Sequence, residues 1–172
     1  MKSVLISIQP KWCELIASGK KTVEVRKTRP KIEAPFKVYI YMTKAYDTLF
    51  GNGKPKKLCV DGGKVIGEFV CDCIQSCCDY EIVSGCSETE WEQISRTTQL
   101  SRTDLLRYSG DGLIYFWHIS DLVIYDKPKD LDCFRKPIDC HRGIQKYDCV
   151  GCWDCEIKRP PQSWCYVEEV QP

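Results

Sequence analysis

The segment from Gly19 to Arg26 gathers charged side chains that could bind or transform a polar ligand. Lys21, Glu24 and Arg26 supply an ammonium group, a carboxylate and a guanidinium group at close spacing. The two cations could contact phosphate or the edge of a base, and the carboxylate could accept a hydrogen bond from an amino group. The alternative is a solvent-facing strand on which Glu24 and Arg26 form an ion pair worth less than about 1 kcal/mol.

The neighbouring residues predict a helix followed by a strand. Residues 10–18 begin with Pro and carry apolar side chains at helical spacing, and Gly19 suits the left-handed turn that ends a helix. From residue 22 to 28 the apolar side chains alternate with polar ones, which predicts a strand with an entirely polar face. Lys21 lies at the junction and can reach that face.

The pattern Gly19-x-Lys21-x-x-Glu24-x-Arg26 resembles the signature of the ASCH (activating signal cointegrator homology) domain, a family of the PUA-like superfamily. Further segments resemble the same family, and the last two of them its phage-associated bacterial branch: Ser7–Lys11, Gly67–Asp72, Trp117–Asp121 and Pro160–Tyr166. The resemblance implies an α+β fold, a PUA-like small β-barrel with flanking short helices. It leaves out roughly residues 43–63 and 133–158.

The resemblance also implies a binding function. In this family the motif lines a cleft that is proposed to bind RNA, so Lys21, Glu24 and Arg26 are expected to bind RNA or a modified nucleotide. Lys20 and Trp117 are added as candidate nucleic-acid-binding residues, because a Trp beside a cleft can stack on a base for about 1–3 kcal/mol. A Trp in a strand is more often part of the core.

A hydrolase is the alternative function. Small bacterial ASCH proteins include acetylcytidine amidohydrolases in which the motif Lys acts with a Thr nucleophile, and other ASCH proteins are reported to cleave RNA. Here Glu24 occupies the Thr position, so Lys21 and Glu24 would act as the catalytic residues on a water nucleophile. The family's catalytic Glu has no secure counterpart, although Glu90 or Glu92 lies in the right region. We favour a binding module over a hydrolase acting on RNA or a modified nucleoside.

Charge and cysteine usage set the cellular context. Residues 1–57 contain 13 Lys plus Arg against 4 Asp plus Glu, a net charge of +9, while residues 58–172 contain 12 against 20, a net charge of −8. A basic region around the motif favours polyanions. Thirteen cysteines without a secretion signal are better read as thiols or metal ligands than as disulfides, and we expect a cytoplasmic protein that contains no membrane span.

Cysteines become dense in the last part of the chain. Cys149, Cys152 and Cys155 have metal-ligand spacing, and Cys140 is our candidate for the fourth ligand of a structural zinc ion. Other candidates for that position are His141, Cys133 and Cys165. An iron–sulfur cluster fits the spacing less well, and reduced thiols without a metal remain the alternative. We read the earlier cysteines, between residues 71 and 86, as small hydrophobic residues.

The remaining patterns predict the other elements. We expect strands over residues 4–9, 36–41, 64–74 and 163–167, and a long β-rich run over residues 113–125 that bends to serve two parts of a barrel. Ser87 with Glu90 and Ser101 with Asp104 form capping boxes, which predict helices over residues 88–94 and 101–108. The predicted organisation is a barrel domain over residues 1–132, a Cys-rich insertion over 133–158 and a closing strand within 159–172.

Overall fold

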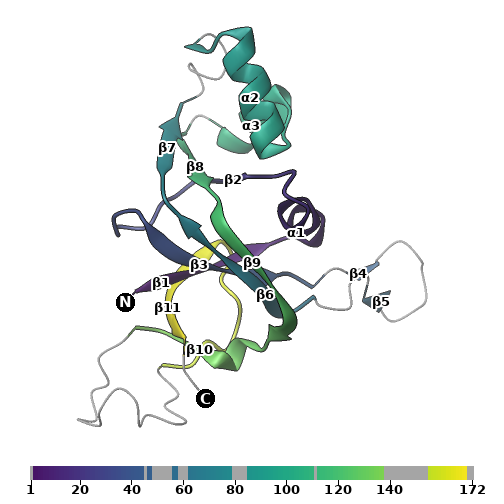
Figure 1. The fold of residues 1–172 in the computed structure, drawn as a ribbon, viewed down its shortest axis with the longest axis vertical. Coiled ribbons are helices and arrows are strands. Elements are labelled where there is room, and N and C mark those ends of the chain that lie inside the picture. The colour runs from purple at the N-terminus through teal and green to yellow at the C-terminus, as the bar shows by residue number, and fades with distance from the viewer. Residues whose placement is uncertain are drawn as a thin grey trace. The chain divides into compact units, whose positions relative to one another are not determined.

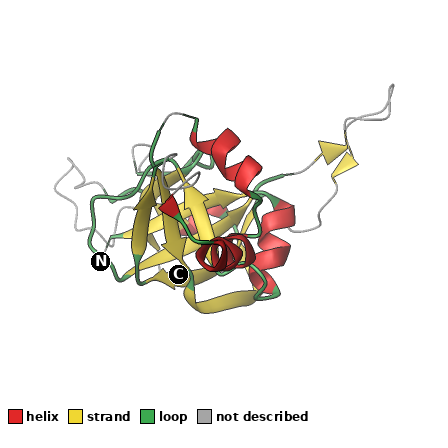
Figure 2. Cartoon of the chain, turned by 90° about the horizontal axis from the view of Figure 1, so that it is seen from above, coloured by secondary structure: helices red, strands yellow, loops and turns green. Residues whose placement is uncertain are grey.

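The computed structural model of the 172-residue chain describes residues 2–44, 46–47, 56–57, 62–78, 85–110, 112–137 and 155–169. The helices are α1 (Pro10–Ala17), α2 (Glu88–Thr98) and α3 (Arg102–Ser109), with a 3-10 turn, η2, at Leu131–Cys133. The strands are β1 (Ser3–Ile8), β2 (Val23–Arg26), β3 (Phe36–Met42), β4 (Tyr46–Asp47), β5 (Lys56–Lys57), β6 (Lys64–Cys71), β7 (Ile74–Cys77), β8 (Ile114–His118), β9 (Ser120–Lys129), β10 (Phe134–Arg135) and β11 (Trp164–Glu169) (Figure 1). The chain is therefore α+β, as predicted, with short helices beside strands (Figure 2).

The strands form a larger and a smaller sheet, together with the β4–β5 pair. The larger sheet has the order β10-β11-β1-β3-β6-β9, and the smaller has the order β2-β8-β7. β1 is buried along its whole length because it runs parallel to β3 on one side and antiparallel to β11 on the other. The strand expected over residues 163–167 is present as β11, and it is the antiparallel partner of the first strand. Among the described residues, no helix is long and apolar enough to cross a membrane.

The chain divides into two compact units, each made of several segments. Unit 1 comprises residues 1–10, 37–68 and 123–172. Its core joins strands of the six-stranded sheet to the C-terminal residues, and the rings of Tyr39 and Phe134 pack edge to face with centroids 4.8 Å apart. The core side chains of unit 1 are Leu5, Tyr39, Tyr41, Val65, Phe134, Ile157 and Val167.

Unit 2 comprises residues 11–36 and 69–122 and contains the motif. One face of its three-stranded sheet presents Val25, Cys77 and Ile114, and these pack with Leu105 of α3. Apolar side chains of both helices and of the loop between them cover the same cluster: Trp91 and Ile94 of α2, Leu100 of the loop and Leu106 of α3.

Both capping boxes are confirmed, since Ser87 and Ser101 each accept a hydrogen bond from the backbone N–H of the acidic residue three positions later. α2 continues past the predicted residue 94 and ends where Gln99 adopts a left-handed conformation at φ 58°. A Gln carries little sequence signal for such a cap, because Gly is the usual residue there.

Two predicted strands are divided in the structure. The single strand expected over residues 64–74 is wrong, because β6 ends at Cys71 and β7 begins at Ile74 in the other sheet. The exposed residues Asp72 and Cys73 form the break. The bend expected within residues 113–125 is confirmed: β8 belongs to the smaller sheet and β9 to the larger.

Candidate functional site

The end of α1 places Lys21 against the body of unit 2. Gly19 adopts a left-handed conformation at φ 70°, where a side chain would be strained. The chain reverses there, so that the backbone N–H of Lys21 donates a 2.9 Å hydrogen bond to the carbonyl of Leu15. The next residue, Thr22, donates its N–H to the carbonyl of Thr97 in α2 at 2.9 Å. These backbone contacts fix the start of β2 between α1 and α2.

The three motif side chains contact one another through the central carboxylate. Nζ of Lys21 lies 3.4 Å from Oε2 of Glu24, and Nη2 of Arg26 lies 3.1 Å from Oε1 of Glu24. Lys21 also donates a 2.8 Å hydrogen bond to the carbonyl oxygen of Thr98, at the end of α2. Its ammonium nitrogen lies 5.2 Å from the centre of the Trp12 ring, within range of a cation–π interaction. We refer to Lys21, Glu24 and Arg26 as the charged triad.

The charged triad is buried. The exposed fractions of its side chains are 2% for Lys21, 8% for Glu24 and 11% for Arg26. Such burial excludes the alternative of a solvent-facing strand with a weak surface ion pair. Loss of hydration at the ammonium group lowers the pKa of Lys21; the nearby Glu24 opposes this effect, and Arg26 adds to it. Lys21 therefore holds its proton less tightly than a surface lysine.

Trp117 lies beside the triad but inside the fold. It is paired with Glu24 across β2 and β8, so both side chains are on the same face of the sheet. Its ring is fully buried and packs edge to face on Phe36, with centroids 5.9 Å apart. The indole thus presents no exposed surface for a base in this conformation. In the structure it forms part of the support beneath Glu24.

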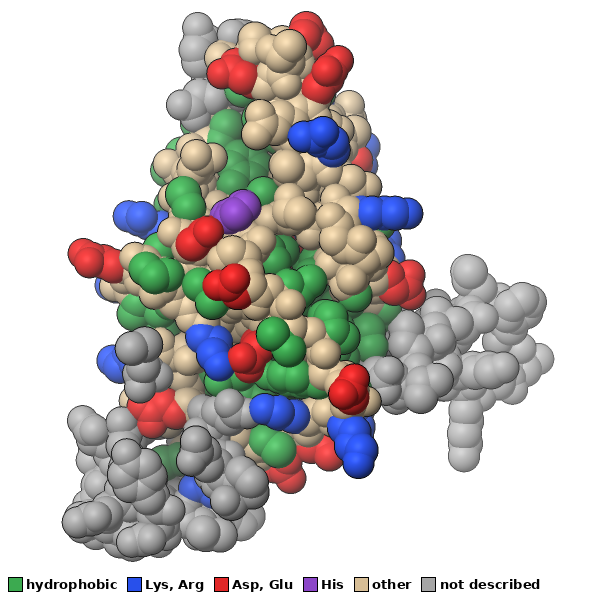
Figure 3. All heavy atoms as spheres, in the orientation of Figure 1, with side chains coloured by type: hydrophobic (Ala, Val, Ile, Leu, Met, Phe, Trp, Pro, Cys, Tyr) green, Lys and Arg blue, Asp and Glu red, His purple; other side chains and the backbone are tan. Residues whose placement is uncertain are grey.

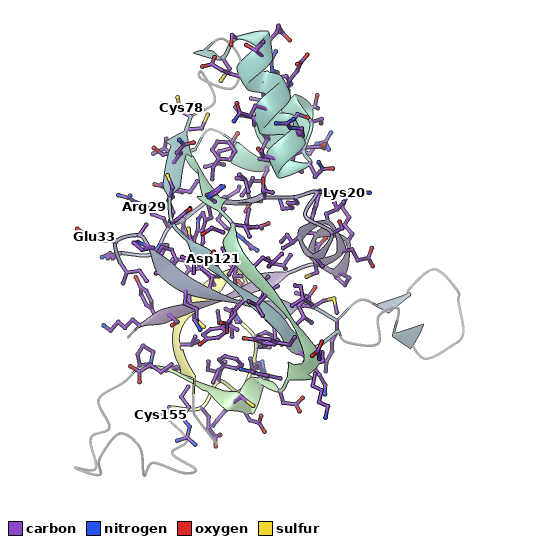
Figure 4. The ribbon with its side chains drawn as sticks, in the orientation of Figure 1. Lys20, Arg29, Glu33, Cys78, Asp121 and Cys155 are labelled. Carbon is purple, nitrogen blue, oxygen red and sulfur yellow. The ribbon has the colours of Figure 1, made fainter. Side chains whose placement is uncertain are left out.

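Lys20 is exposed, in contrast to Lys21. Its carbonyl accepts a 3.2 Å hydrogen bond from Nε2 of Gln99, which ties the motif to the end of α2. Gln99 also lines an open groove along α2, together with Trp91, Glu92, Ser95, Arg96, Leu100 and Ser101. Figure 4 labels Lys20, whose side chain points away from the ribbon.

Tyr108, which the sequence reasoning missed, lies at the other end of β2. The residue is 38% exposed, and the ammonium nitrogen of Lys27 lies over its ring, 5.3 Å from the ring centre. Burial raises the pKa of Tyr108, Arg26 lowers it and Glu24 raises it, so the phenol lies within the electrostatic reach of the triad. No motif in the sequence marks this residue, because only the packing of α3 brings it to β2.

Glu90 and Glu92, the candidates for the family's catalytic Glu, do not form the carboxylate contact with Lys21. Oε2 of Glu90 accepts a 2.8 Å hydrogen bond from the backbone N–H of Ser87 and completes a helix cap. Glu92 is exposed and lines the α2 groove. The carboxylate that contacts Lys21 is that of Glu24.

Only some of the cysteines proposed as zinc ligands lie within the described residues. Cys140, Cys149 and Cys152 of the predicted zinc site, and His141, lie outside the described residues. Cys155 is buried, and Cys133 and Cys165 pack against the core of unit 1. Across the described ranges no three potential ligands gather as a metal site. In unit 2, Cys71 is fully buried, and burial raises the pKa of its thiol to about 12, while Cys73 is exposed.

The fold and the motif agree with comparisons to known proteins. Residues 6–130 match the model of the ASCH domain family, which is well over half of the chain. No curated protein is similar enough to count as a match. The solved structures that resemble the chain include ASCH proteins from Zymomonas mobilis, and at their level of identity the likeness concerns the fold alone.

Three of these structures illustrate the likeness. A Tyr-to-Phe mutant is 21% identical with a TM-score of 0.60, and the match covers 98% of this chain and 91% of that chain. A Ser-to-Ala mutant is 20% identical with a TM-score of 0.59, covering 96% and 88%. A third structure, of ASCH from the same organism, is 20% identical with a TM-score of 0.59, covering 98% of both chains. Because the family model matches residues 6–130, which is most of this chain, the chain belongs to the ASCH domain family.

Proposed function

We propose that the protein binds RNA or a modified nucleotide through Lys21, Glu24 and Arg26. The observation that carries the proposal is the buried contact of one carboxylate with two cations. Removing three charged groups from water costs several kcal/mol per ion, and the attraction between them offsets this only partly. Buried charges with altered pKa values are concentrated at functional sites. Membership of the ASCH family supports nucleic acid as the ligand class.

Each triad residue has a role that follows from its chemistry. Arg26 is the most exposed of the three and offers donors to a phosphate or to a base edge. Glu24 accepts hydrogen bonds from an exocyclic amino group and so discriminates among bases. Lys21 holds Glu24 in place and adds positive charge.

The test is a titration of labelled, mixed-sequence single-stranded RNA followed by fluorescence anisotropy. Lys21→Met and Arg26→Gln are each expected to weaken binding, and Glu24→Gln is expected to change which base is preferred. The control is Lys37→Met, which removes a cation of unit 1 that is paired with Glu68 at 2.7 Å. Circular dichroism spectra establish that each variant is folded. Wild-type affinity in all three triad variants would show that the ligand does not bind here.

A hydrolase is the second candidate, favoured by the lowered pKa of Lys21. A lysine that loses its proton more readily serves better as a general base, and Glu24 beside it could stabilise the charge that develops on an attacking water. The test is mass spectrometry of RNA that contains acetylcytidine after incubation with the protein. Loss of an acetyl group or scission of the chain, abolished by Lys21→Met, would identify an enzyme. An unchanged mass together with Lys21-dependent binding leaves the binding function.

A further inference from the structure

A basic segment continues from the triad beyond the end of β2. Arg26, Lys27, Arg29 and Lys31 are all cations, and no acidic residue lies between Val25 and Ile32. Lys27, Arg29 and Lys31 are exposed. This segment belongs to unit 2, the same compact unit as the triad.

Two tyrosines accompany these cations. The ammonium group of Lys27 lies 5.3 Å from the ring centre of Tyr108, and the guanidinium group of Arg29 lies 5.9 Å from that of Tyr115. Tyr115 is paired with Arg26 across β2 and β8, so it shares a sheet face with the triad. Tyr108 and Tyr115 therefore both lie next to the end of β2 at Arg26. We call Lys27, Arg29, Tyr108 and Tyr115 the aromatic–basic strip.

The charges of the aromatic–basic strip are available to a ligand. Within the described part of the chain, neither Lys27 nor Arg29 forms an ion pair with a carboxylate. On the face of the molecule in Figure 3, acidic and basic side chains are interspersed. Two neighbouring cations that form no ion pair attract a polyanion, and tyrosine rings give bases a surface for stacking.

The strip has a direction relative to the motif. Figure 4 shows Lys20 and Arg29 at opposite ends of β2, with the strand between them. The triad residues Glu24 and Arg26 lie on that strand. A nucleotide held by the triad would thus have the strip on one side, where the next nucleotides of the same chain would lie.

We propose that the aromatic–basic strip binds the nucleotides that flank the one recognised by the triad, so that the ligand is a single-stranded RNA chain and not a free nucleoside. Lys27 and Arg29 contact phosphates, and Tyr108 stacks on a base. Tyr115 is half-buried and orients Arg29. This inference rests on the proposed function and specifies its substrate class.

The experiment measures RNA affinity at several salt concentrations for wild type and for the double variant Lys27→Gln/Arg29→Gln. For single strands, log K falls with log salt at a slope of about −0.7 per neutralised phosphate. Loss of two contacts should therefore make the slope shallower by about 1.4. The matched control is Lys127→Gln/Lys129→Gln on β9, because Lys129 also lies over a tyrosine ring, 4.5 Å from the centre of Tyr125. The slope of the control should equal that of wild type.

Stacking is tested separately with Tyr108→Leu, and Tyr108→Phe is the conservative variant. Loss of the ring should reduce affinity for an oligonucleotide roughly tenfold, whereas Tyr108→Phe should retain it. Affinity for a mononucleotide should be unchanged in Tyr108→Leu and lost in Lys21→Met.

The possible outcomes separate the two proposals. In one outcome, RNA binds in a Lys21-dependent manner while the salt dependence of affinity is the same in Lys27→Gln/Arg29→Gln as in the control. In that case the proposal that the strip binds RNA is wrong, and the proposed function of the triad stands. Equal wild-type affinity for a mononucleotide and an oligonucleotide would also overturn the strip. If the wild-type protein binds no RNA at all, both proposals fail.

Discussion

Nζ of Lys21 lies 3.4 Å from Oε2 of Glu24, and both side chains are almost completely buried. Removing the carboxylate leaves two cations without their shared partner, so Glu24→Gln should lower the free energy of unfolding by about 3–5 kcal/mol. Lys21→Met should cost less, because Glu24 then keeps Arg26 at 3.1 Å. Urea denaturation of the two variants measures the difference. Equal losses would mean that the triad does not share one carboxylate as described.

The lowered pKa of Lys21 predicts how stability depends on pH. The unfolded chain keeps a Lys pKa near 10.5, and burial lowers the pKa in the folded state, so the unfolded state binds more protons between these two values. The contribution of Lys21 to stability must therefore rise with pH through this alkaline window. Lys21→Met should remove that increment. Unfolding curves collected across the window, for wild type and variant at constant ionic strength, would show parallel pH profiles if Lys21 were solvated in the folded state.

Gly67 on β6 is required by the close approach of β9. A Cβ atom at residue 67 would lie 2.4 Å from the carbonyl oxygen of Val123, which is backbone and cannot rotate away. Gly67→Ala should destabilise the protein by roughly 1–3 kcal/mol, as expected for overpacking. Gly112→Ala is the matched control, because its Cβ would have its nearest contact at an ordinary 3.6 Å, to Ser109. Thermal unfolding of both variants compares them, and a stable Gly67→Ala protein would place β9 farther from β6.

Zinc binding by the Cys-rich segment remains a prediction. The spacing of Cys149, Cys152 and Cys155 predicts one equivalent of zinc per chain, measured by elemental analysis of the purified protein. Cys152→Ser should lose the metal, whereas Cys86→Ser, which removes a half-buried thiol of unit 2, should keep it. A folded wild-type protein without zinc would show that this segment needs no metal.

The sequence predicted local structure better than it predicted burial. Ser87 and Glu90 identify the start of α2 because a capping box is a contact between near neighbours, and Gly19 identifies the end of α1 for the same reason. The family motif identified the triad residues, but a polar strand face by itself gives no sign of being enclosed. Glu24 is enclosed beside Trp117 of β8, and its partner Lys21 is held by Thr98 at the end of α2; both elements are distant in sequence.

Tyr108 and Trp117 also show that the sequence does not reveal which side chains are buried: Trp117 was expected beside a cleft and is buried, whereas Tyr108 was not singled out and is partly exposed. An aromatic residue in a strand and another at the end of a helix carry similar sequence signals. Only the assembled unit shows that Trp117 packs on Phe36 and that Tyr108 keeps part of its ring exposed beside Lys27.

The pairing of β1 with β11 bears on how the chain folds during its synthesis. Ser7, at the end of β1, bonds through its side chain to the carbonyl of Pro161, 154 residues later, and the ladder continues from Ser3 opposite Val167 to Ile6 opposite Trp164. During synthesis β1 must therefore wait for β11, with one edge unpaired, while the residues between them are translated. Contacts over such a separation form slowly. Until β11 has been made, the nascent chain holds an apolar strand with one edge uncovered, and this interval is the one in which a chaperone would matter most.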